Sequence, residues 1–502
     1  MKKYITHVLL ACLCSIGIHA QSMEDALRYA RPELAGTARY IGMGGAFNAL
    51  GGDFSAINDN PAGAAVFINS EFGGSLNIVG NKINTNYLGS SNNLNSDAFN
   101  ISQFGAVFVL GNTVENGITK LIFAYNYQKT QSFDYKYNAI GTNPSRGIDN
   151  YFLNYAQGIP YRDIRTYDDE SLSESYEYLG NNLGFGSQQA FLGFQSYIIN
   201  PVDENDDNLI YLSNSNPQNQ AVDHDFFVVN SGNNSKHTFN ISAQFQENLY
   251  VGMNFNSHRT EFRRIDNLEE FNYGSDSNFN YTVFENELFT VGDGFSFQLG
   301  AIYKLKNNLR IGLSYQSSTW YNFTDELLQY IETSEGAEID IVDPRIINVY
   351  EYQIKTPSTL SGGLAYVFGT KGLLSVQYDL TDYSNLKFNI GRGDNNLMNQ
   401  NRKIERTLQS AGTLKLGAEY RIEKLSLRSG YFNRESINSI DSDLSKGYSF
   451  GLGYYFGGSM LSLGLFLQEV ERSESMYQEG LTDVIDLNNK QSQFLVSYTI
   501  KL

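Results

Sequence analysis

The chain has 502 residues, enough for two or three ordinary soluble domains or for one large closed architecture. Hydrophobic residues make up 41 %, aromatic residues 14 % and charged residues only 18 %, below the roughly 25 % of soluble domains. The formal charge of −18 argues against nucleic acid as a partner, because binding of phosphate needs a cationic surface.

Residues 1–20 have the pattern of a cleaved signal peptide. Lys2 and Lys3 form a positive start, Val8 to Ile18 is apolar, and Ile18-His19-Ala20 precedes a plausible cleavage before Gln21. The sequence therefore predicts export. Loss of the two lysines changes the formal charge from −18 to −20.

Both cysteines of the chain, Cys12 and Cys14, lie in this leader. The mature chain is therefore expected to have neither a disulfide framework nor a thiolate metal site. An alternative is a lipoprotein that begins at Cys12, which would leave an apolar start in place of the usual polar tether. A signal peptide cleaved before Gln21 is favoured over the lipoprotein.

Beyond residue 20 there is no run of about 18 apolar residues, so no membrane-spanning helix is expected. Apolar residues instead recur at every second position. Leu461, Leu463, Leu465 and Leu467 alternate with small or polar residues over much of this stretch, and Phe494 to Leu502 repeats the pattern. One continuous apolar face and one polar or glycine face suit a strand between lipid and a wet lumen. A soluble β-sandwich or propeller also alternates, but export and the terminal apolar ladder favour a membrane barrel.

The alternation predicts an all-β fold, a fourteen-stranded antiparallel transmembrane β-barrel with an N-terminal hatch that plugs the lumen. The expected strands lie near 70–88, 99–111, 117–137, 236–246, 249–265, 291–306, 308–323, 350–368, 372–390, 403–421, 424–436, 446–457, 459–475 and 490–502. Short and long connections alternate, so the first strand is expected to start and the last strand to end on the periplasmic side, with the long loops outside. The longest of these is an insertion at about 138–235, which belongs to the barrel domain 70–502.

Residues 21–69 do not alternate and are expected to form the hatch. Met23 to Ala30 could form a short amphipathic helix. Glycines and other small residues follow, and they suit a segment whose backbone must pack closely inside a barrel. The expected hatch or gating residues are Gly42, Gly44, Gly45, Asn60, Pro61 and Ala62.

The hatch carries a resemblance to a known family. Ala38-Arg39-Tyr40-Ile41-Gly42-Met43-Gly44-Gly45-Ala46-Phe47, then Ser55-Ala56-Ile57 and Asn60-Pro61-Ala62-Gly63, is similar to the hatch of the FadL/TodX family. The resemblance implies an outer-membrane transporter for long-chain fatty acids and other hydrophobic compounds, with fourteen strands and Asn60, Pro61 and Ala62 inside the barrel. It also implies release through a lateral opening at a kinked strand, which the sequence does not place.

Other motifs have plainer interpretations. Gly447 to Gly451 matches the G-x-S-x-G elbow of hydrolases but lies in an alternating strand. Gly42-x-Gly44 lacks the third glycine of a dinucleotide loop. The acidic run Asp203 to Asn208 lacks the glycine and the glutamate of a calcium loop, so a solvated loop is expected, with bridging of a divalent ion as the lesser alternative. The aromatic stretch from Tyr176 to Phe194 could be a helical lid or only a packed loop.

No histidine pair has metal-ligand spacing, so no metal site is predicted. No Ser/His/Asp set can be proposed either, so no catalytic residue or cofactor is predicted. The predicted function is passive uptake of hydrophobic small molecules through the cell outer membrane, with ligand-binding residues unknown. The alternative is a barrel that does not transport and serves as a subunit of an outer-membrane secretion or assembly complex. An enzyme is the weakest hypothesis. Expected partners are a hydrophobic small molecule or lipid, the outer-membrane lipid, and other outer-membrane proteins through the extracellular loops.

Overall fold

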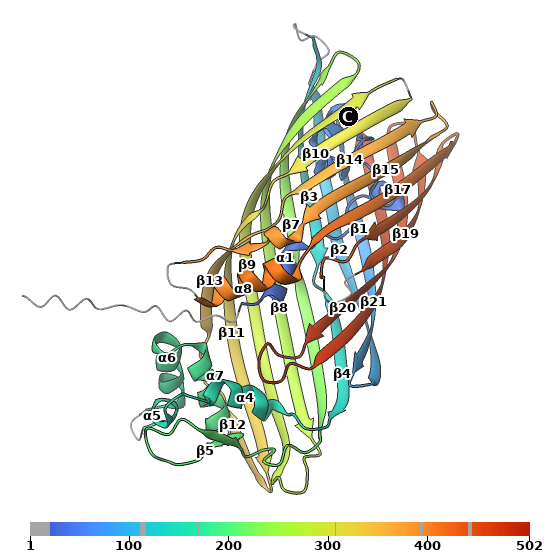
Figure 1. Cartoon of the computed structure of the whole chain (residues 1–502). Helices are drawn as coiled ribbons and strands as arrows, with labels where there is room; N and C mark the ends of the chain where they lie inside the picture. The colour runs from blue at the N-terminus through green and yellow to red at the C-terminus, as the bar shows by residue number, and fades with distance from the viewer. Residues whose placement is uncertain (1–20, 111–116, 168–169, 307, 392–394, 440–443) are drawn as a thin grey trace, which may run out of the picture.

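The computed structural model describes residues 21–110, 117–167, 170–306, 308–391, 395–439 and 444–502. The predicted signal peptide, with Cys12 and Cys14, lies outside these residues. Nineteen strands join into one antiparallel sheet, which closes because the last strand pairs with the first from Glu71↔Lys501 to Tyr87↔Ile485. Five of the nineteen continue the line of another strand after a short interruption. We call each strand of the wall, together with any short strand that continues its line, one stave. The barrel therefore has fourteen staves, as predicted from the sequence (Figure 1).

The staves follow one another around the barrel in chain order. They are β1 (Glu71–Tyr87), β2 (Ser90–Leu110), β3 with β4 (Ile118–Ser132, Tyr135–Asn143), β7 (Val222–Phe245), β8 (Leu249–Phe271), β9 (Phe279–Lys304), β10 with β11 (Leu309–Gln316, Trp320–Glu335), β12 with β13 and β14 (Glu338–Val342, Asn348–Lys355, Thr359–Val367), β15 with β16 (Gly372–Asp382, Lys387–Phe388), β17 (Ser410–Ile422), β18 (Leu425–Arg434), β19 (Ser445–Tyr455), β20 (Ser459–Ser475) and β21 (Val484–Lys501).

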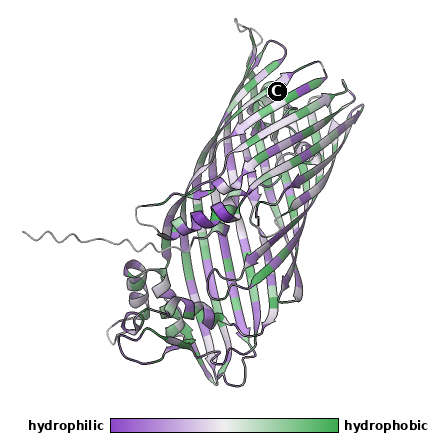
Figure 2. Ribbon diagram, in the orientation of Figure 1, coloured by the Kyte–Doolittle hydropathy of each residue, from purple (hydrophilic) through white to green (hydrophobic). Residues whose placement is uncertain are grey.

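Apolar side chains cover the outer face of the barrel in one band. Ile311, Leu364 and Val376 lie directly opposite one another on three neighbouring strands, and between 41 % and 52 % of each is exposed. Hydropathy colouring shows apolar and polar residues alternating along the strands (Figure 2). None of the described helices is long and apolar enough to cross a membrane.

The wall is much taller on one side than on the other. β9 has 26 residues, whereas β15 has 11. We call the tall part the extension: it comprises β4, the outer halves of β7, β8 and β9, and β11, β12 and β13 (Figure 1). Four helices and a two-stranded hairpin accompany it, namely α4 (Ile148–Ala156), α5 (Tyr161–Ile164), α6 (Leu172–Asn182), α7 (Phe185–Gln195), β5 (Ile199–Pro201) and β6 (Tyr211–Ser213).

Several predicted strands were too short at the long-loop end. The expected insertion at 138–235 begins only after β4 ends at Asn143, and it ends where β7 begins at Val222. β2 likewise begins at Ser90, so the expected loop 89–98 is largely strand. The physical reason is that the extension stands in water on its outer face. Many of its outward residues are polar, such as Arg259, Glu261 and Arg263 on β8, and the continuous apolar face of the lipid-facing strands is lost there.

The strand expected at 403–421 was wrong at its start. Residues Asn395–Thr407 form helix α8, and strand β17 begins at Ser410. Leu397 and Ile404 of this helix are buried in a core that also holds Met23 and Leu27. The stretch from Tyr176 to Phe194, for which a lid helix and a packed loop were both open, is helical over most of its length.

The lipid-facing band leads to a test with a matched control on the same stave. Leu364→Arg places a charge in the middle of the apolar band, and we expect a loss of about 2–4 kcal/mol in the free energy of unfolding. Val349→Arg is equally exposed on the outer face but belongs to the extension, so it should cost less than about 0.5 kcal/mol. Urea titration of the refolded barrel, followed by heat-modifiable mobility, measures both. Similar losses at the two positions would contradict the placement of the membrane.

Candidate functional site

Residues 21–69 fold inside the barrel as four short helices, α1 (Met23–Ala30), α2 (Ala38–Gly42), α3 (Ala56–Asp59) and η1 (Pro61–Val66). The predicted helix Met23 to Ala30 is confirmed. It begins with a capping box, in which Ser22 Oγ accepts from the N–H of Asp25 and the Asp25 carboxylate accepts from the N–H of Ser22. Most side chains from Leu34 to Ala65 are buried, so this hatch is a packed core of its own.

Glycines on the inner wall make room for the hatch. Five pairs of glycines lie directly opposite one another on adjacent strands: Gly73↔Gly105, Gly252↔Gly300, Gly312↔Gly363, Gly417↔Gly430 and Gly451↔Gly464. We call these ten residues the glycine belt. A Cβ atom added at Gly252 would lie 2.5 Å from the carbonyl carbon of Pro61. A Cβ at Gly464 would lie 3.0 Å from the carbonyl oxygen of Ala38. The hatch backbone thus rests against the backbone of the wall.

Two of the predicted hatch glycines adopt a backbone conformation that favours glycine, and a third packs against the backbone of the wall. Gly44 and Gly45 have φ angles of +62° and +74°, which other residues rarely adopt. A Cβ at Gly42 would lie 3.1 Å from the Cα of Gly451 on β19. Ser449, the central residue of the G-x-S-x-G match, lies in the same strand and accepts a hydrogen bond from the N–H of Gly44. That motif therefore supports the hatch and lacks the strand–turn–helix context of a nucleophile.

Asn60 satisfies backbone groups that the lumen would otherwise leave unpaired. Its side-chain amide donates to the carbonyl oxygens of Asn48 (2.8 Å) and Ala301 (3.1 Å), and its Oδ1 accepts from the N–H of Ala62. Pro61 begins η1, where its missing N–H leaves no gap. The three residues thus tie α3, η1 and the wall together, and their role in gating stays a prediction.

Buried ion pairs fasten the hatch at two further places. Arg39 of α2 lies 3.1 Å from the Glu419 carboxylate, which also pairs with Arg428 at 2.7 Å. Lys415 lies 2.9 Å from Asp379 and 3.6 Å from Asp59. Sequence reasoning did not find these residues. In the sequence, Glu419 and Lys415 appear only as charged residues on the inward face of a strand, which a water-filled lumen also explains. Their partners in the hatch, Arg39 and Asp59, lie several hundred residues away in the chain.

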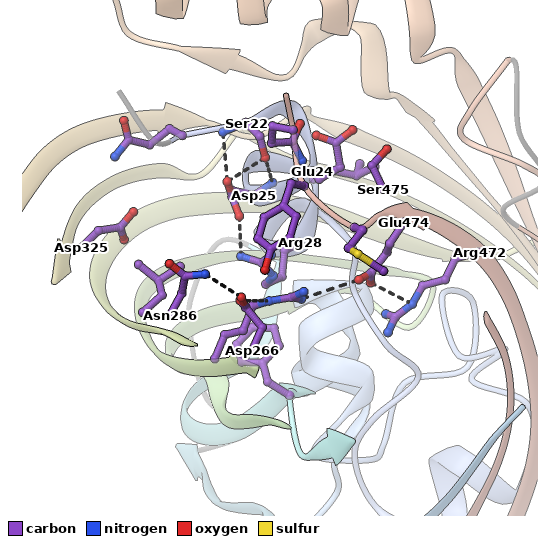
Figure 3. Close-up of a pocket in the computed structure, with 18 of the residues that line it drawn as sticks. Ser22, Glu24, Asp25, Arg28, Asp266, Asn286, Asp325, Arg472, Glu474 and Ser475 are labelled. Atoms are coloured by element: carbon purple, nitrogen blue, oxygen red, sulfur yellow. Dashed lines mark hydrogen bonds and ion pairs between the residues drawn. The ribbon is translucent and has the colours of Figure 1, made fainter. Parts of the chain in front are cut away.

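A cavity of about 700 Å³ lies between α1 and the helices at the barrel mouth. Its charged wall is shown in Figure 3: Arg264 lies between Asp266 (3.1 Å) and Glu474 (3.6 Å), and Arg472 pairs with Glu474 at 3.3 Å. On the α1 side, Arg28 pairs with Asp25 at 2.9 Å. Aromatic and aliphatic side chains complete the lining: Leu27, Phe133, Tyr151, Tyr155, Leu288 and Leu327. The cavity is therefore amphipathic, and these arginines are neutralised by carboxylates of the chain.

Helix α4 covers the mouth and is clamped to the rim. The N–H of Ile148 donates to Glu270 (2.7 Å), His224 lies 3.1 Å from the same carboxylate, and Tyr87 shares a hydrogen bond with His224 Nδ1 (2.7 Å). His224 falls within the expected loop insertion at 138–235, but it lies in β7 and is fully buried. Burial, and then the Glu270 carboxylate, raises the pKa of the Asp149 carboxyl on α4 to about 7.

The wall has a break between its second and third staves. β2 pairs with β3 only from Gln103↔Gln128 to Leu110↔Leu121, although both staves continue toward the mouth. Beyond the break the edge of β3 is met by the hatch. The Glu33 N–H donates to the carbonyl oxygen of Thr130 (3.3 Å), the Ser132 N–H donates to the Glu33 carboxylate (3.2 Å), and Gln128 Nε2 donates to the carbonyl oxygen of Ala35 (2.5 Å). We call residues 33–35 the latch.

The third stave is itself interrupted after Ser132. Its continuation, β4, does not pair with β2 but packs against β1 and β2. Asn81 Nδ2 donates to the carbonyl oxygen of Asp134 (3.1 Å), and Thr85 Oγ1 donates to that of Asn138 (2.7 Å). Side chains of β1 therefore cover the free edge of β4. No local pattern marks the break, because Thr130 to Asp134 alternates in the same way as its neighbours.

Within the described residues, no group of three or more His, Cys, Asp or Glu side chains could hold a metal ion. The acidic stretch Asp203 to Asn208 is mostly exposed, as expected of a solvated loop. The site is thus a plugged lumen with a cavity above the plug and a break in the wall beside it.

The architecture is a closed antiparallel barrel with an N-terminal plug, and comparisons with known proteins find the same architecture and a matching family model. Residues 231–458 match the model of the family described as "Outer membrane protein transport protein (OMPP1/FadL/TodX)". This match confirms the resemblance to the FadL/TodX family. It lies in the barrel, outside the hatch segment from which the resemblance was first drawn.

Solved structures show the same fold. A Pseudomonas aeruginosa FadL homologue is 12 % identical, with 94 % of this chain and 99 % of that chain covered and a TM-score of 0.56. The P. putida toluene transporter TodX is 14 % identical, with 94 % and 99 % covered and a TM-score of 0.50. No curated protein sequence matches this chain.

The glycine belt gives a test with neighbouring residues on opposite faces. A Cβ at Gly363 would lie 3.0 Å from the Cβ of Asn48 and 3.2 Å from the N of Ala49, whereas one at Gly362 would meet nothing within 4 Å. We expect Gly363→Leu to push the hatch out of place, so that small-ion conductance in planar bilayers rises and trypsin cleaves the hatch in the folded barrel. Gly362→Leu should behave as wild type in both assays. A well-plugged Gly363→Leu barrel would contradict the proposed contact.

Proposed function

We propose that the chain is an outer-membrane channel for passive uptake of hydrophobic small molecules, of the kind of long-chain fatty acids or aromatic compounds. The observation that carries this proposal is the break between β2 and β3, which is closed from inside by the latch beside a cavity large enough for such a ligand. Fold and family agree with it. The proposal needs no catalytic residue, cofactor or metal.

The lining of the cavity suits a ligand with a long apolar part and a small polar end. Burial of apolar surface supplies about 0.8 kcal/mol per CH₂ group, so a long chain would bind without a charged anchor. The paired charges around Arg264 can hydrogen-bond a polar end without a net charge preference. These features support capture of the ligand from water above the hatch.

The latch supports release to the side. Where β2 no longer pairs with β3, residues 33–35 bind the free edge of β3 instead. Lys129 Nζ also donates to Asn100 Oδ1 at 2.7 Å, which is a further polar contact across the break. Movement of the latch toward the lumen would join the cavity to the membrane. The hatch residues Asn60, Pro61 and Ala62 would keep the rest of the plug in place during that movement.

We infer that the protein is exported with cleavage before Gln21. We also infer that the first strand of the barrel starts, and the last strand ends, on the periplasmic side. The short turns, the start of β1 and the end of β21 lie at one end of the barrel and the helical insertion at the other, which supports this orientation (Figure 1). A barrel that does not transport would need neither the cavity nor the latch, so these two features favour uptake over that alternative.

The first test is uptake itself. Radiolabelled oleate and toluene are offered to a transporter-null host that makes the protein at wild-type level. We expect faster uptake of at least one of them than in the empty host, because the cavity and the break provide a path. Cells that make a folded barrel and yet take up neither compound would overturn the proposal, provided that a known transporter works in the same host.

The second test concerns the latch. Glu33→Ala removes the carboxylate that accepts from the Ser132 N–H, a bond worth about 1–3 kcal/mol. We expect uptake up to about tenfold faster if opening of the latch limits the rate. Glu33→Gln keeps an acceptor oxygen and should stay near wild type, which separates loss of the bond from loss of charge. Unchanged uptake in Glu33→Ala, in a host where wild type transports, would remove the latch from the mechanism.

A further inference from the structure

The extension ends on one side in an unpaired strand edge. β12 pairs only with β11, from Ile331↔Val342 to Glu335↔Glu338. β13 continues the same stave and also pairs with β11, but on its other side it meets only β16, at Ile354 and Lys355. From residue 338 to about residue 352 this edge of the sheet has no neighbouring strand among the described residues.

The direction of the backbone groups follows from the hairpin. Glu335 and Glu338 flank the two-residue turn at Gly336 and Ala337, and residues that flank such a turn form a hydrogen-bonded pair. Glu338, Asp340 and Val342 therefore point their N–H and C=O groups toward β11. Ile339 and Ile341 point theirs away, and within the described residues no hydrogen bond reaches them from that side.

The side chains at this edge are apolar and exposed. Ile339, Ile341, Ile347 and Val349 are exposed to 59 %, 58 %, 50 % and 57 %. Ile341 lies opposite Glu332 and Val349 lies opposite Glu326, both on the outer face of β11. We call these four residues with their free backbone the edge patch.

The edge patch stands well clear of the membrane. Trp320, the single tryptophan, is exposed on the outer face of the neighbouring strand β11, at the foot of the extension. The strand from Trp320 to Glu332 extends about 40 Å at about 3.3 Å per residue, or about 30 Å along a barrel axis tilted by about 40°. Lipid chains do not reach that height, so they do not explain the apolar side chains.

Carboxylates surround the edge patch. The carboxylates are Glu332 on β11, Glu338 and Asp340 on β12, Asp343 in the loop after β12, and Glu351 on β13. Arg345 is the cation in this stretch, and it pairs with Asp343 at 3.2 Å. The local field therefore favours a basic partner.

The two strand edges of the extension differ in whether other residues cover their backbone groups. The β4 edge is covered by Asn81 and Thr85, which occupy its carbonyl oxygens. Exposed strand edges are usually blocked by charges, proline, bulges or a covering segment, because they recruit other chains. The β12 edge instead combines free backbone groups with exposed isoleucines.

We propose that the edge patch is a docking site for another protein, which adds an extended segment of alternating apolar and basic residues as a further strand beside β12. Main-chain hydrogen bonds to Ile339 and Ile341 would supply affinity, and the apolar and acidic side chains would select the sequence. This site lies outside the cavity and does not depend on transport. It gives a physical form to the expectation of protein partners at the extracellular side.

The experiment uses the full chain in nanodiscs and a fluorescent octapeptide of alternating valine and lysine. Fluorescence anisotropy is expected to show saturable binding above that of empty nanodiscs, weakened by salt. A peptide of alternating valine and glutamate should bind at least tenfold more weakly, as should the valine–lysine peptide with N-methyl groups along one edge. Equal binding of all three peptides would overturn the proposal.

The matched variant is Ile341→Pro. Proline removes the N–H that points away from β11 and leaves the pairing with β11 intact, so the barrel should fold while peptide binding falls at least tenfold. Ile339→Ser with Ile341→Ser keeps the backbone and removes the apolar contacts, and it should also weaken binding. Undiminished binding to both variants would overturn the site. Self-association of wild type that Ile341→Pro abolishes, without peptide binding, would assign the edge to a second copy of the chain and overturn the basic partner.

Discussion

Close contact between two backbones, that of the hatch and that of the barrel wall, is the constraint on which the rest of the structure depends. Fourteen strands enclose a lumen too wide for their own side chains to fill. The glycine belt lets residues 38–62 approach the wall without a side chain between them, and side chains such as Asn60 pair the polar groups that this contact buries. A plug held in this way is rigid over most of its area.

Rigidity of the plug explains why the break in the wall lies where it does. The strongly fastened part of the hatch, with Arg39 and Asn60, lies at the short-turn end. The latch at residues 33–35 lies between this part and α1, and it is held by three hydrogen bonds to β3. The proposed lateral release requires this segment to move while the rest of the plug stays, so Leu34 would have to leave the core of the hatch in which it is buried.

The unequal height of the wall has a second consequence. Above the membrane the barrel no longer closes, so the tall staves end in two strand edges. One edge lies against β1 and is capped by its side chains, whereas the other, at β12, keeps free backbone groups and exposed isoleucines. An open sheet above a closed barrel thus creates a surface that a fully closed barrel would not have.

The sequence by itself determined the number of staves, the lipid-facing positions and the hatch with its helix from Met23 to Ala30. Each of these follows from local periodicity, since a strand between lipid and lumen must alternate and a plug must not. Tertiary structure alone decided the ends of the tall strands, helix α8, the ion pairs of Glu419 and Lys415, and the break beside Ser132. Outside lipid the alternation loses its apolar face, and pairs between residues hundreds of positions apart leave no local pattern. The opposition of Gly312 and Gly363 shows the division well: each glycine was visible in its strand, but only the register of the closed barrel brought them together against Asn48.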